Sequence, residues 1–188
     1  GDREQQAART QESETKSMES NPFAFLDPYI DQLCETLDAV VVMPGMHDPC
    51  TVTLPQQPLL RTLLPRASQR TSLHLGTNPT WFSLNGRAIL ATSGQNLDDL
   101  LKYMPDDAKR DSSAALDMAV ATLRWSHMAP TAPDTLWCYP FKAADAFVIR
   151  AAPDVYVIGT QAAFATTTFQ ASPPPQVRVI LVPPFART

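Results

Sequence analysis

Residues 39–49 read Ala-Val-Val-Val-Met-Pro-Gly-Met-His-Asp-Pro, an apolar run followed at once by a turn. The run Val40–Met43 is continuous and mostly β-branched, which predicts a strand that is covered on both faces. Upstream, large apolar residues recur at helical spacing: Phe23, Leu26, Ile30, Leu33 and Leu37. Asn21-Pro22 stands just before them as a cap and a first helical position. A helix that feeds a buried strand indicates an α/β fold.

Downstream, the sequence alternates short strand-like runs with turns and two helical segments. Asn85-Gly86 separates two of these runs and is the strongest short hairpin signal. Asn96 is predicted to cap a helix that ends at Tyr103, and Ser113 is predicted to open a second helix that ends at Trp125. Strands are predicted at residues 72–75, 81–84, 87–91, 147–149, 155–159, 164–169 and 177–182.

The composition is that of a globular domain and limits the classes of partner. The 188 residues include 44% hydrophobic and 18% charged residues and carry a formal net charge of −4. This charge gives no overall basic field for a nucleic-acid backbone, which disfavours a free-standing DNA-binding module. No apolar run approaches the length of a membrane span. The three cysteines, Cys34, Cys50 and Cys138, lack the spacing of a zinc site and are expected to be free thiols.

The beginning of the chain differs from the rest. Residues 1–20 contain one large apolar residue, Met18, so they are predicted to form a disordered polar arm ahead of one folded portion at residues 21–188. The 18 prolines against 6 glycines predict long ordered connections between short elements. Because the sequence starts without an initiator Met, we expect it to be a piece of a longer protein.

The turn Gly45-Met46-His47-Asp48 is the first candidate site. A strand that ends in Gly-x-His-Asp resembles the loop by which metallophosphoesterases deliver metal ligands. In those enzymes an Asn precedes the His, and here that position holds Met46. A thioether does not replace an amide oxygen as a ligand of a hard metal. We therefore expect a loop that keeps its shape without its chemistry, with Gly45 in a backbone conformation that a side chain would strain.

A set of ordered motifs carries a more specific resemblance. The motifs are Thr53–Leu59, Thr77–Pro79, Thr92–Asn96, His127–Leu136, Cys138–Phe141 and Val155–Gly159. Together they resemble the small regulatory subunits, or B-subunits, of DNA polymerase delta. Members of that family combine an OB domain with a catalytically inactive calcineurin-like phosphoesterase domain. The resemblance implies that this chain is the C-terminal portion of the phosphoesterase sandwich, in which helices flank β-sheets, and that the N-terminal portion and the OB domain lie outside it.

The resemblance also implies which positions correspond to a metal centre. An active phosphoesterase of this class binds two metals through several motifs, of which the last is Gly-His-x-His. Here Gly159, Thr160 and Gln161 stand at that last motif, and both histidines are absent. His127 matches the preceding motif and, with Gly45–Asp48, completes the relic active-site positions. We expect no catalytic residue, no metal and no cofactor.

The segment Leu54–Leu59, which reads Leu-Pro-Gln-Gln-Pro-Leu, is a candidate contact element. Its prolines restrict the backbone around Gln56 and Gln57, whose amides can both donate and accept hydrogen bonds. The favoured interpretation is an internal brace in which these amides bond backbone groups of the long loop. The alternative is a rigid interface for another chain, formed by Leu54, Gln56 and Gln57.

Three aromatic residues form a second candidate interface. Alternation along an extended segment places Trp137 and Tyr139 on one face, and Phe141 follows. Stacking of nucleic-acid bases would need interleaved Lys or Arg residues, and few lie nearby. Packing in the core or against another protein is therefore favoured for these aromatics.

The function implied by the resemblance is that of a non-catalytic accessory subunit of replicative DNA polymerase delta. Its partners would be the C-terminal cysteine-rich region of the catalytic subunit and further polymerase subunits. It would act in the nucleus, contact DNA only indirectly and bind no membrane. The alternative, from another class, is an active metal-dependent phosphoesterase or nuclease, against which the missing histidines argue.

Overall fold

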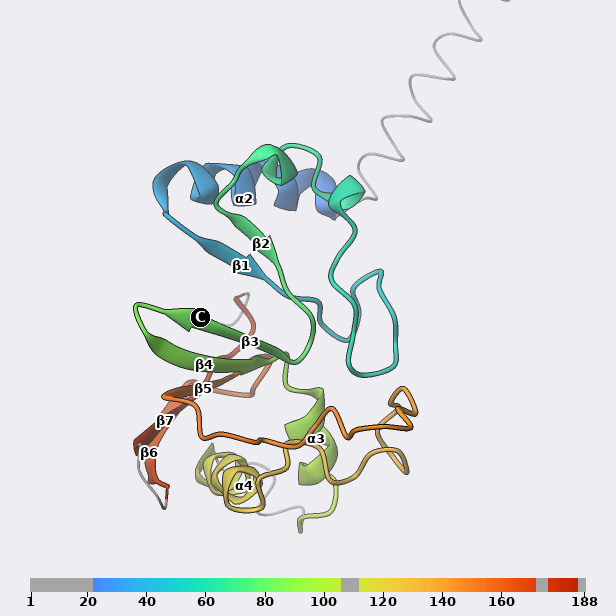
Figure 1. Ribbon diagram of the computed structural model, residues 1–188, viewed down its shortest axis with the longest axis vertical. Helices are drawn as coiled ribbons and strands as arrows, with labels where there is room; N and C mark the ends of the chain where they lie inside the picture. The colour runs from blue at the N-terminus through green and yellow to red at the C-terminus, as the bar shows by residue number, and fades with distance from the viewer. Residues whose placement is uncertain (1–21, 106–111, 172–175, 186–188) are drawn as a thin grey trace, which may run out of the picture. The chain divides into compact units, whose positions relative to one another are not determined.

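The computed structural model describes residues 22–105, 112–171 and 176–185 (Figure 1). The predicted polar arm at residues 1–20 lies outside the described residues. The chain divides into two compact units. The first contains the residues up to Val42 together with Leu59–Leu75, and the second contains Met43–Pro58 and the residues from Gly76 onward. Helices and strands are mixed along the chain, so the predicted α/β class is confirmed.

The first unit combines one long helix with a two-stranded parallel sheet. Helix α2 (Phe23–Thr36) leads into β1 (Val40–Val42), which pairs in parallel with β2 (Leu73–Leu75). Two short 3-10 helices, η1 (Arg61–Leu63) and η2 (Ala67–Gln69), precede β2. The predicted order of a helix followed by a strand is therefore confirmed.

A buried carboxylate on α2 holds the start of η2. Asp27 lies on the buried face of the helix, although the apolar pattern did not include it. Its Oδ1 accepts a hydrogen bond from the N–H of Ala67 (2.9 Å), and its Oδ2 accepts one from the N–H of Arg66 (3.0 Å). The first N–H groups of a helix have no partner within it, so this carboxylate satisfies two of them.

The sheet of the first unit is less covered than the sequence predicts. Val41 in β1 and its neighbour His74 in β2 are both exposed, and they share one face of the sheet. The expectation that β1 is covered on both faces is therefore wrong for the described residues. A continuous apolar run does not reveal which face a helix will cover.

The second unit is built on a five-stranded mixed sheet with the strand order β3-β4-β5-β7-β6. The strands are β3 (Thr80–Leu84), β4 (Arg87–Thr92), β5 (Val155–Ile158), β6 (Ala165–Gln170) and β7 (Gln176–Leu181). β4, β5 and β7 run parallel to one another. The two outer strands, β3 and β6, are each antiparallel to their neighbour.

The strand predictions agree with the structure within one or two residues, with one exception. Asn85 and Gly86 join β3 to β4 with positive φ values of 49° and 76°, as a two-residue hairpin turn requires. The predicted strand at residues 147–149 is absent from the described sheets. Instead, the N–H of Ile149 donates to the carbonyl of Ser126 (2.8 Å), because this segment pairs with the loop after a helix and not with a strand.

Two helices stand beside this sheet, α3 (Gln95–Leu101) and α4 (Ser112–Arg124). α4 packs against β6 and β7, and α3 packs against α4 (Figure 1). The predicted cap of α3 is wrong, because the N-cap is Gly94 and Asn96 lies inside the helix. The amide of Asn96 donates instead to the carbonyl of Met128 (2.8 Å). No helix within the described ranges is both long and apolar enough to cross a membrane.

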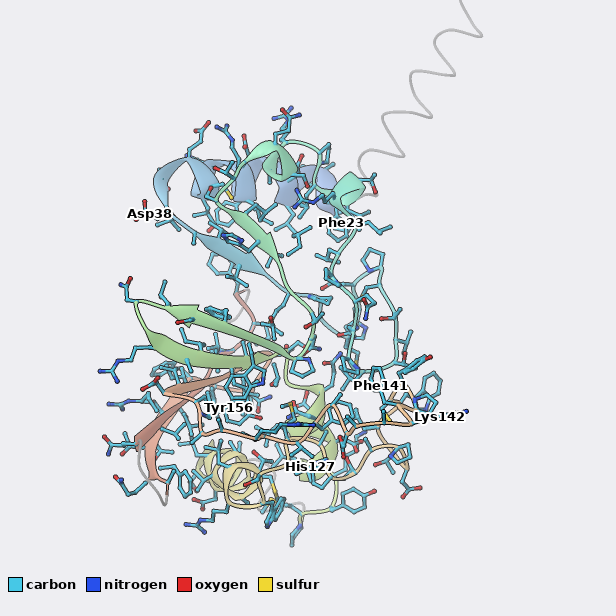
Figure 2. The ribbon with its side chains drawn as sticks, viewed as in Figure 1. Phe23, Asp38, His127, Phe141, Lys142 and Tyr156 are labelled. Carbon is cyan, nitrogen blue, oxygen red and sulfur yellow. The ribbon has the colours of Figure 1, made fainter. Side chains whose placement is uncertain are left out.

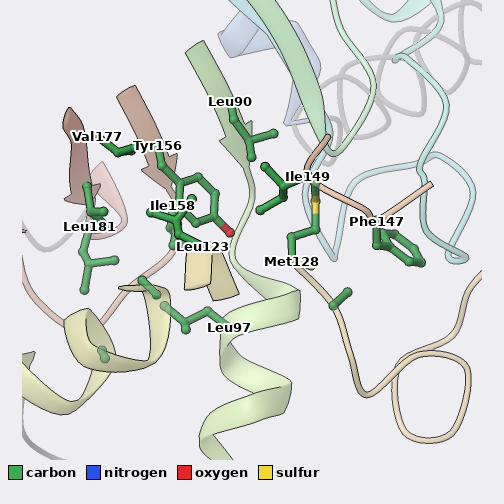
Figure 3. Packing of buried hydrophobic residues seen from close by; sticks show 14 of the residues in the cluster. Leu90, Leu97, Leu123, Met128, Phe147, Ile149, Tyr156, Ile158, Val177 and Leu181 are labelled. Atoms are coloured by element: carbon green, nitrogen blue, oxygen red, sulfur yellow. The ribbon is translucent and has the colours of Figure 1, made fainter. Parts of the chain in front are cut away.

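The hydrophobic core of the second unit lies between one face of the sheet and these helices (Figure 3). Alternate residues of β5 and β7 supply much of its sheet side: Tyr156, Ile158, Val177, Val179 and Leu181. Leu97 of α3 and Leu123 of α4 supply part of the helix side. Tyr156 is fully buried, which raises the pKa of its hydroxyl, and Asn96 donates to its oxygen (3.3 Å). The burial of this face places the strand-end loops of the unit on a rigid base.

Candidate functional site

The turn at residues 45–48 closes on itself. The N–H of Gly45 donates to Oδ2 of Asp48 (2.6 Å), and the N–H of Asp48 makes a longer bond to the carbonyl of Gly45 (3.4 Å). Met46 and His47, at the tip of the turn, are exposed. The carboxylate of Asp48 therefore stabilises the turn, and His47 is accessible to solvent.

The expectation of backbone strain at Gly45 is wrong. Gly45 has no positive φ, and a Cβ there would lie 3.4 Å from Oδ2 of Asp48, which is an ordinary contact. The constrained glycine is Gly94, whose φ is 109° and whose Cβ would lie 2.2 Å from the carbonyl oxygen of Gly159. Sequence cannot distinguish the two glycines, because the close approach at Gly94 comes from a distant part of the chain.

Four polar side chains from three of the motifs form a largely buried cluster, here called the amide cluster: Gln56, Asn78, Ser93 and Gln95. Nδ2 of Asn78 lies 2.7 Å from Oε1 of Gln56, 2.7 Å from Oγ of Ser93 and 2.6 Å from Oε1 of Gln95. Nε2 of Gln95 donates to Oε1 of Gln56 (3.1 Å), and the hydroxyl of Ser93 donates to Oε1 of Gln95. Because Gln56 and Asn78 are each only 1% exposed, these bonds replace the water that burial removes.

Gln56 connects the amide cluster to the turn at residues 45–48. Its Nε2 donates to the carbonyls of Gly45 and Thr51, both at 3.0 Å. The brace interpretation is therefore confirmed for Gln56. Leu54 and Gln56 are buried, so the alternative that they present an interface to another chain is wrong. Gln57 is exposed and remains a candidate.

The relic positions at residues 159–161 pack against the turn that precedes α3. The hydroxyl of Thr160 donates to the carbonyl of Ser93 (2.5 Å). Gln161 is buried, and its Nε2 donates to the carbonyl of Gly159 and to Oδ1 of Asp98, both at 3.1 Å. Burial raises the pKa of Asp98, and the hydrogen bond from Gln161 partly opposes that rise. Thr160 and Gln161 are thus engaged by the chain itself.

His127 lies in a separate pair with Asp145. Its Nε2 is 2.8 Å from Oδ2 of Asp145, and its Nδ1 accepts a hydrogen bond from the N–H of Ala129 (3.3 Å). A ring nitrogen that accepts carries no proton, so the N–H of the neutral ring lies on Nε2 and faces Asp145. Burial raises the pKa of Asp145, but the hydrogen bonds from His127 and from the N–H of Phe147 outweigh it and hold that pKa below its ordinary value.

The relic positions do not fit a two-metal site. Within residues 22–105, 112–171 and 176–185, no group of three or more His, Cys, Asp or Glu residues could hold a metal ion. Met46, Thr160 and Gln161 offer a thioether, a hydroxyl and an amide where the resemblance places the ligands of hard metals. The side chains of Asp48 and His127 are bonded within the chain.

Three exposed aromatic residues form a surface that we call the aromatic ridge: Trp137, Tyr139 and Phe141, which are 66%, 59% and 52% exposed. The backbone beneath them is fixed by Leu54, whose N–H donates to the carbonyl of Trp137 (2.9 Å) and whose carbonyl accepts from the N–H of Tyr139 (2.7 Å). The rings of Tyr139 and Phe141 are in contact, with centroids 4.8 Å apart. Half-buried Cys138 lies between Trp137 and Tyr139, so the two aromatics share one face as the alternation predicts, and that face is exposed and not packed in the core.

Sequence reasoning did not identify Asp99 as a link between α3 and the loop at residues 131–135. The carboxylate is buried, accepts from Nζ of Lys102 (2.7 Å), and accepts from the hydroxyl of Thr135 (2.6 Å). The amide cluster was missed in the same way. The available signal was that Gln56, Asn78 and Gln95 all belong to the motifs that carry the resemblance.

These contacts define a mixed α/β protein in which amide and hydroxyl side chains join the strand-end loops of the second unit. A sequence profile of the family of B-subunits of DNA polymerases alpha and epsilon matches residues 2–166. The chain belongs to this family of polymerase B-subunits.

Individual relatives are similar over most of the chain. It is 40% identical over 176 residues to a DNA polymerase delta small subunit of Arabidopsis thaliana, an alignment covering 94% of this chain and 38% of the relative. The DNA polymerase delta subunit 2 of Drosophila melanogaster is 37% identical over 183 residues, an alignment that covers 97% of this chain and 40% of the relative. The DNA polymerase delta small subunit of Saccharomyces cerevisiae is 36% identical over 174 residues, and the alignment covers 80% of this chain and 36% of the relative. The chain thus spans about two-fifths of the length of the curated relatives it matches.

Proposed function

We propose that the protein containing this chain is a non-catalytic accessory subunit of replicative DNA polymerase delta. The observation that carries this proposal is identity of 36% to 40% to small subunits of that polymerase, over 80% or more of this chain. Such a subunit would hold the C-terminal cysteine-rich region of the catalytic subunit and tether further polymerase subunits. It would act in the nucleus and contact DNA only through the assembly.

The chemistry of the strand-end loops supports a role without catalysis. Hydrolysis of a phosphodiester in this fold requires two metal ions that activate water and stabilise negative charge. Here Gln56 holds the loop that carries Asp48, and Gln161 bonds to Asp98 and to its own backbone. We therefore interpret the site as a degenerate phosphoesterase centre in which uncharged amides have taken over the cross-linking of loops.

The family relationship also supports a calcineurin-like phosphoesterase sandwich, with residues 21–188 as its C-terminal portion. Each unit supplies a sheet with a helix packed on it, α2 beside β1 in the first and α4 beside β6 and β7 in the second. In such a fold, the loops at the ends of the parallel strands carry the site. The turns at residues 45–48, 93–94 and 159–161 are the loops that this proposal assigns to it.

A pull-down of the full-length subunit with the cysteine-rich region of the catalytic subunit tests the functional proposal. We expect the wild-type pair to associate, and Trp137→Ala and Tyr139→Ala to weaken the complex while leaving the fold intact, because both side chains are largely exposed. Trp81→Ala, which removes another exposed tryptophan of the second unit, is the matched control and should bind normally. Absence of association for the wild type would refute the assignment. Normal association of both ridge variants would refute only the proposed position of the interface.

A further inference from the structure

A cleft of about 440 Å³ lies beside the aromatic ridge and is lined by residues 132–133 and 138–147. One end of its longer wall is fixed by Cys138, which bridges to Leu54 in the manner of a parallel strand. The other end is fixed by Asp145, whose oxygens engage His127 and the N–H of Phe147. The wall between these anchors contains small exposed alanines, so the cleft is a hollow with two fixed ends.

Two side chains of opposite charge line this cleft, and Lys142 is the one that has no partner among the described residues. Asp145 and Lys142 are the charged side chains along the longer wall, and both oxygens of Asp145 are already bonded. Lys142 is exposed and pairs with no carboxylate in the described part of the chain. Figure 2 shows Lys142 next to Phe141 at the outer end of the loop. A ligand that covers the ridge and reaches this end therefore meets an unpaired ammonium group.

We propose that the cleft and the aromatic ridge bind an extended acidic segment of another polymerase subunit. An apolar side chain of the segment fills the alanine-lined hollow, and a neighbouring carboxylate pairs with Lys142. Exposed aromatic groups of this kind mark binding surfaces, and tryptophan and tyrosine commonly carry most of the energy of an interface. Because hydrogen bonds to Leu54 already fix the backbone of the ridge, that backbone loses little conformational entropy when a ligand binds.

Single-stranded nucleic acid fits the same surface less well. Bases could stack on Tyr139 and Phe141, but proteins that bind single strands line the path of the backbone with several cations. Among the described residues that line it, the cleft offers one free cation, Lys142, in a chain whose formal net charge is −4. An acidic peptide requires only one complementary charge beside an apolar anchor.

Carbodiimide coupling in the assembled polymerase complex tests the inference, which rests on the proposed function. The reagent joins an amine to a carboxylate in direct contact, with loss of water to the reagent, and mass spectrometry identifies the linked residues. We expect Lys142 to be linked to an Asp or Glu of another subunit. Carbodiimide links formed elsewhere in the same complex report that the chemistry has worked.

Two phenylalanine variants of the full-length subunit provide the matched comparison. Phe141→Ala should abolish the intersubunit link of Lys142 and raise the Kd of the complex about tenfold or more. Phe164→Ala removes another exposed ring elsewhere in the second unit, 65% exposed against 52% for Phe141, and should change neither quantity.

Three other outcomes would contradict the inference, and they differ in what they imply for the proposed function and for the ligand. A complex that forms and yields carbodiimide links but none from Lys142, or that keeps its Kd in Phe141→Ala, overturns the inference and leaves the proposed function intact. Loss of the Lys142 link on adding a single-stranded oligonucleotide would assign the surface to nucleic acid instead. A wild-type subunit that does not assemble at all overturns both proposals.

Discussion

Replacement of Gly94 by alanine is expected to destabilise the protein by about 2–4 kcal/mol, as the sum of two costs. The first is conformational, because a non-glycine residue at the φ of 109° found here loses about 1 kcal/mol or more. The second is steric, because the new Cβ would lie 2.2 Å from the carbonyl oxygen of Gly159. That oxygen belongs to the backbone and not to a flexible side chain, so relief requires movement of the turn that carries Thr160.

Two other glycines separate these costs. Gly86 has a φ of 76° with no described atom within 4 Å of its Cβ position, so Gly86→Ala should show the conformational cost alone, about 1 kcal/mol. Gly45 has neither feature, and Gly45→Ala should change the stability by about 0.5 kcal/mol at most. Urea unfolding of the full-length protein, followed by circular dichroism, gives the three values. A loss at Gly94 no larger than the loss at Gly86 would refute the close approach of the two turns.

Three further changes are informative. Gln56→Leu leaves buried polar groups of the amide cluster without partners and should lower the free energy of unfolding by about 2–4 kcal/mol, whereas Gln57→Leu at an exposed position should have little effect in the same urea assay. His47→Ala should leave the melting temperature unchanged, and neither it nor the wild type should hydrolyse a phosphodiester with manganese; turnover that His47→Ala abolishes would contradict the degenerate site. The pKa of Asp145 is lowered from 3.8 in the folded protein, so its ionised form stabilises the fold above that pH. The stability advantage of the wild type over Asp145→Asn should therefore shrink as the pH falls below about 4 and through the lowered pKa, and an advantage that does not shrink over this range would contradict the pairing with His127.

The features that sequence predicted correctly are those with local causes. Asn85-Gly86 specifies its hairpin because the turn chemistry is contained in two adjacent residues. The helix before residue 40 and the strand after it follow from the spacing of apolar residues. The placement of Trp137 and Tyr139 on one face follows from the alternation of an extended chain.

The features that sequence missed depend on contacts between distant segments. Asn96 has the residue type of a helix cap, but the carbonyl of Met128 and the hydroxyl of Tyr156 engage its amide inside the core. Gly45 and Gly94 are alike in sequence, and only the position of Gly159 decides which of them tolerates a side chain. The motifs that resemble the family were visible as separate stretches, and folding was needed to bring their amides into one cluster.

The amide cluster also shows where sequence reasoning about the site was incomplete. Gln56 was correctly interpreted as a brace, because a buried loop must satisfy its backbone carbonyls. Its partners Asn78 and Gln95 could not be named, since an amide side chain in a loop carries no periodic or spacing signal. Only the common occurrence of all three in family motifs pointed to a shared role.

The proposed non-catalytic role is tested most directly by measuring the catalytic subunit of the polymerase with and without the full-length accessory subunit. Two quantities are recorded on the same preparations: the half-life of polymerase activity at elevated temperature and the single-turnover rate of nucleotide incorporation. On this proposal the subunit holds the assembly together and supplies no reacting group, so we expect it to lengthen the half-life and leave the single-turnover rate unchanged. An unchanged half-life, or a single-turnover rate that depends on the subunit, would contradict the role proposed for it.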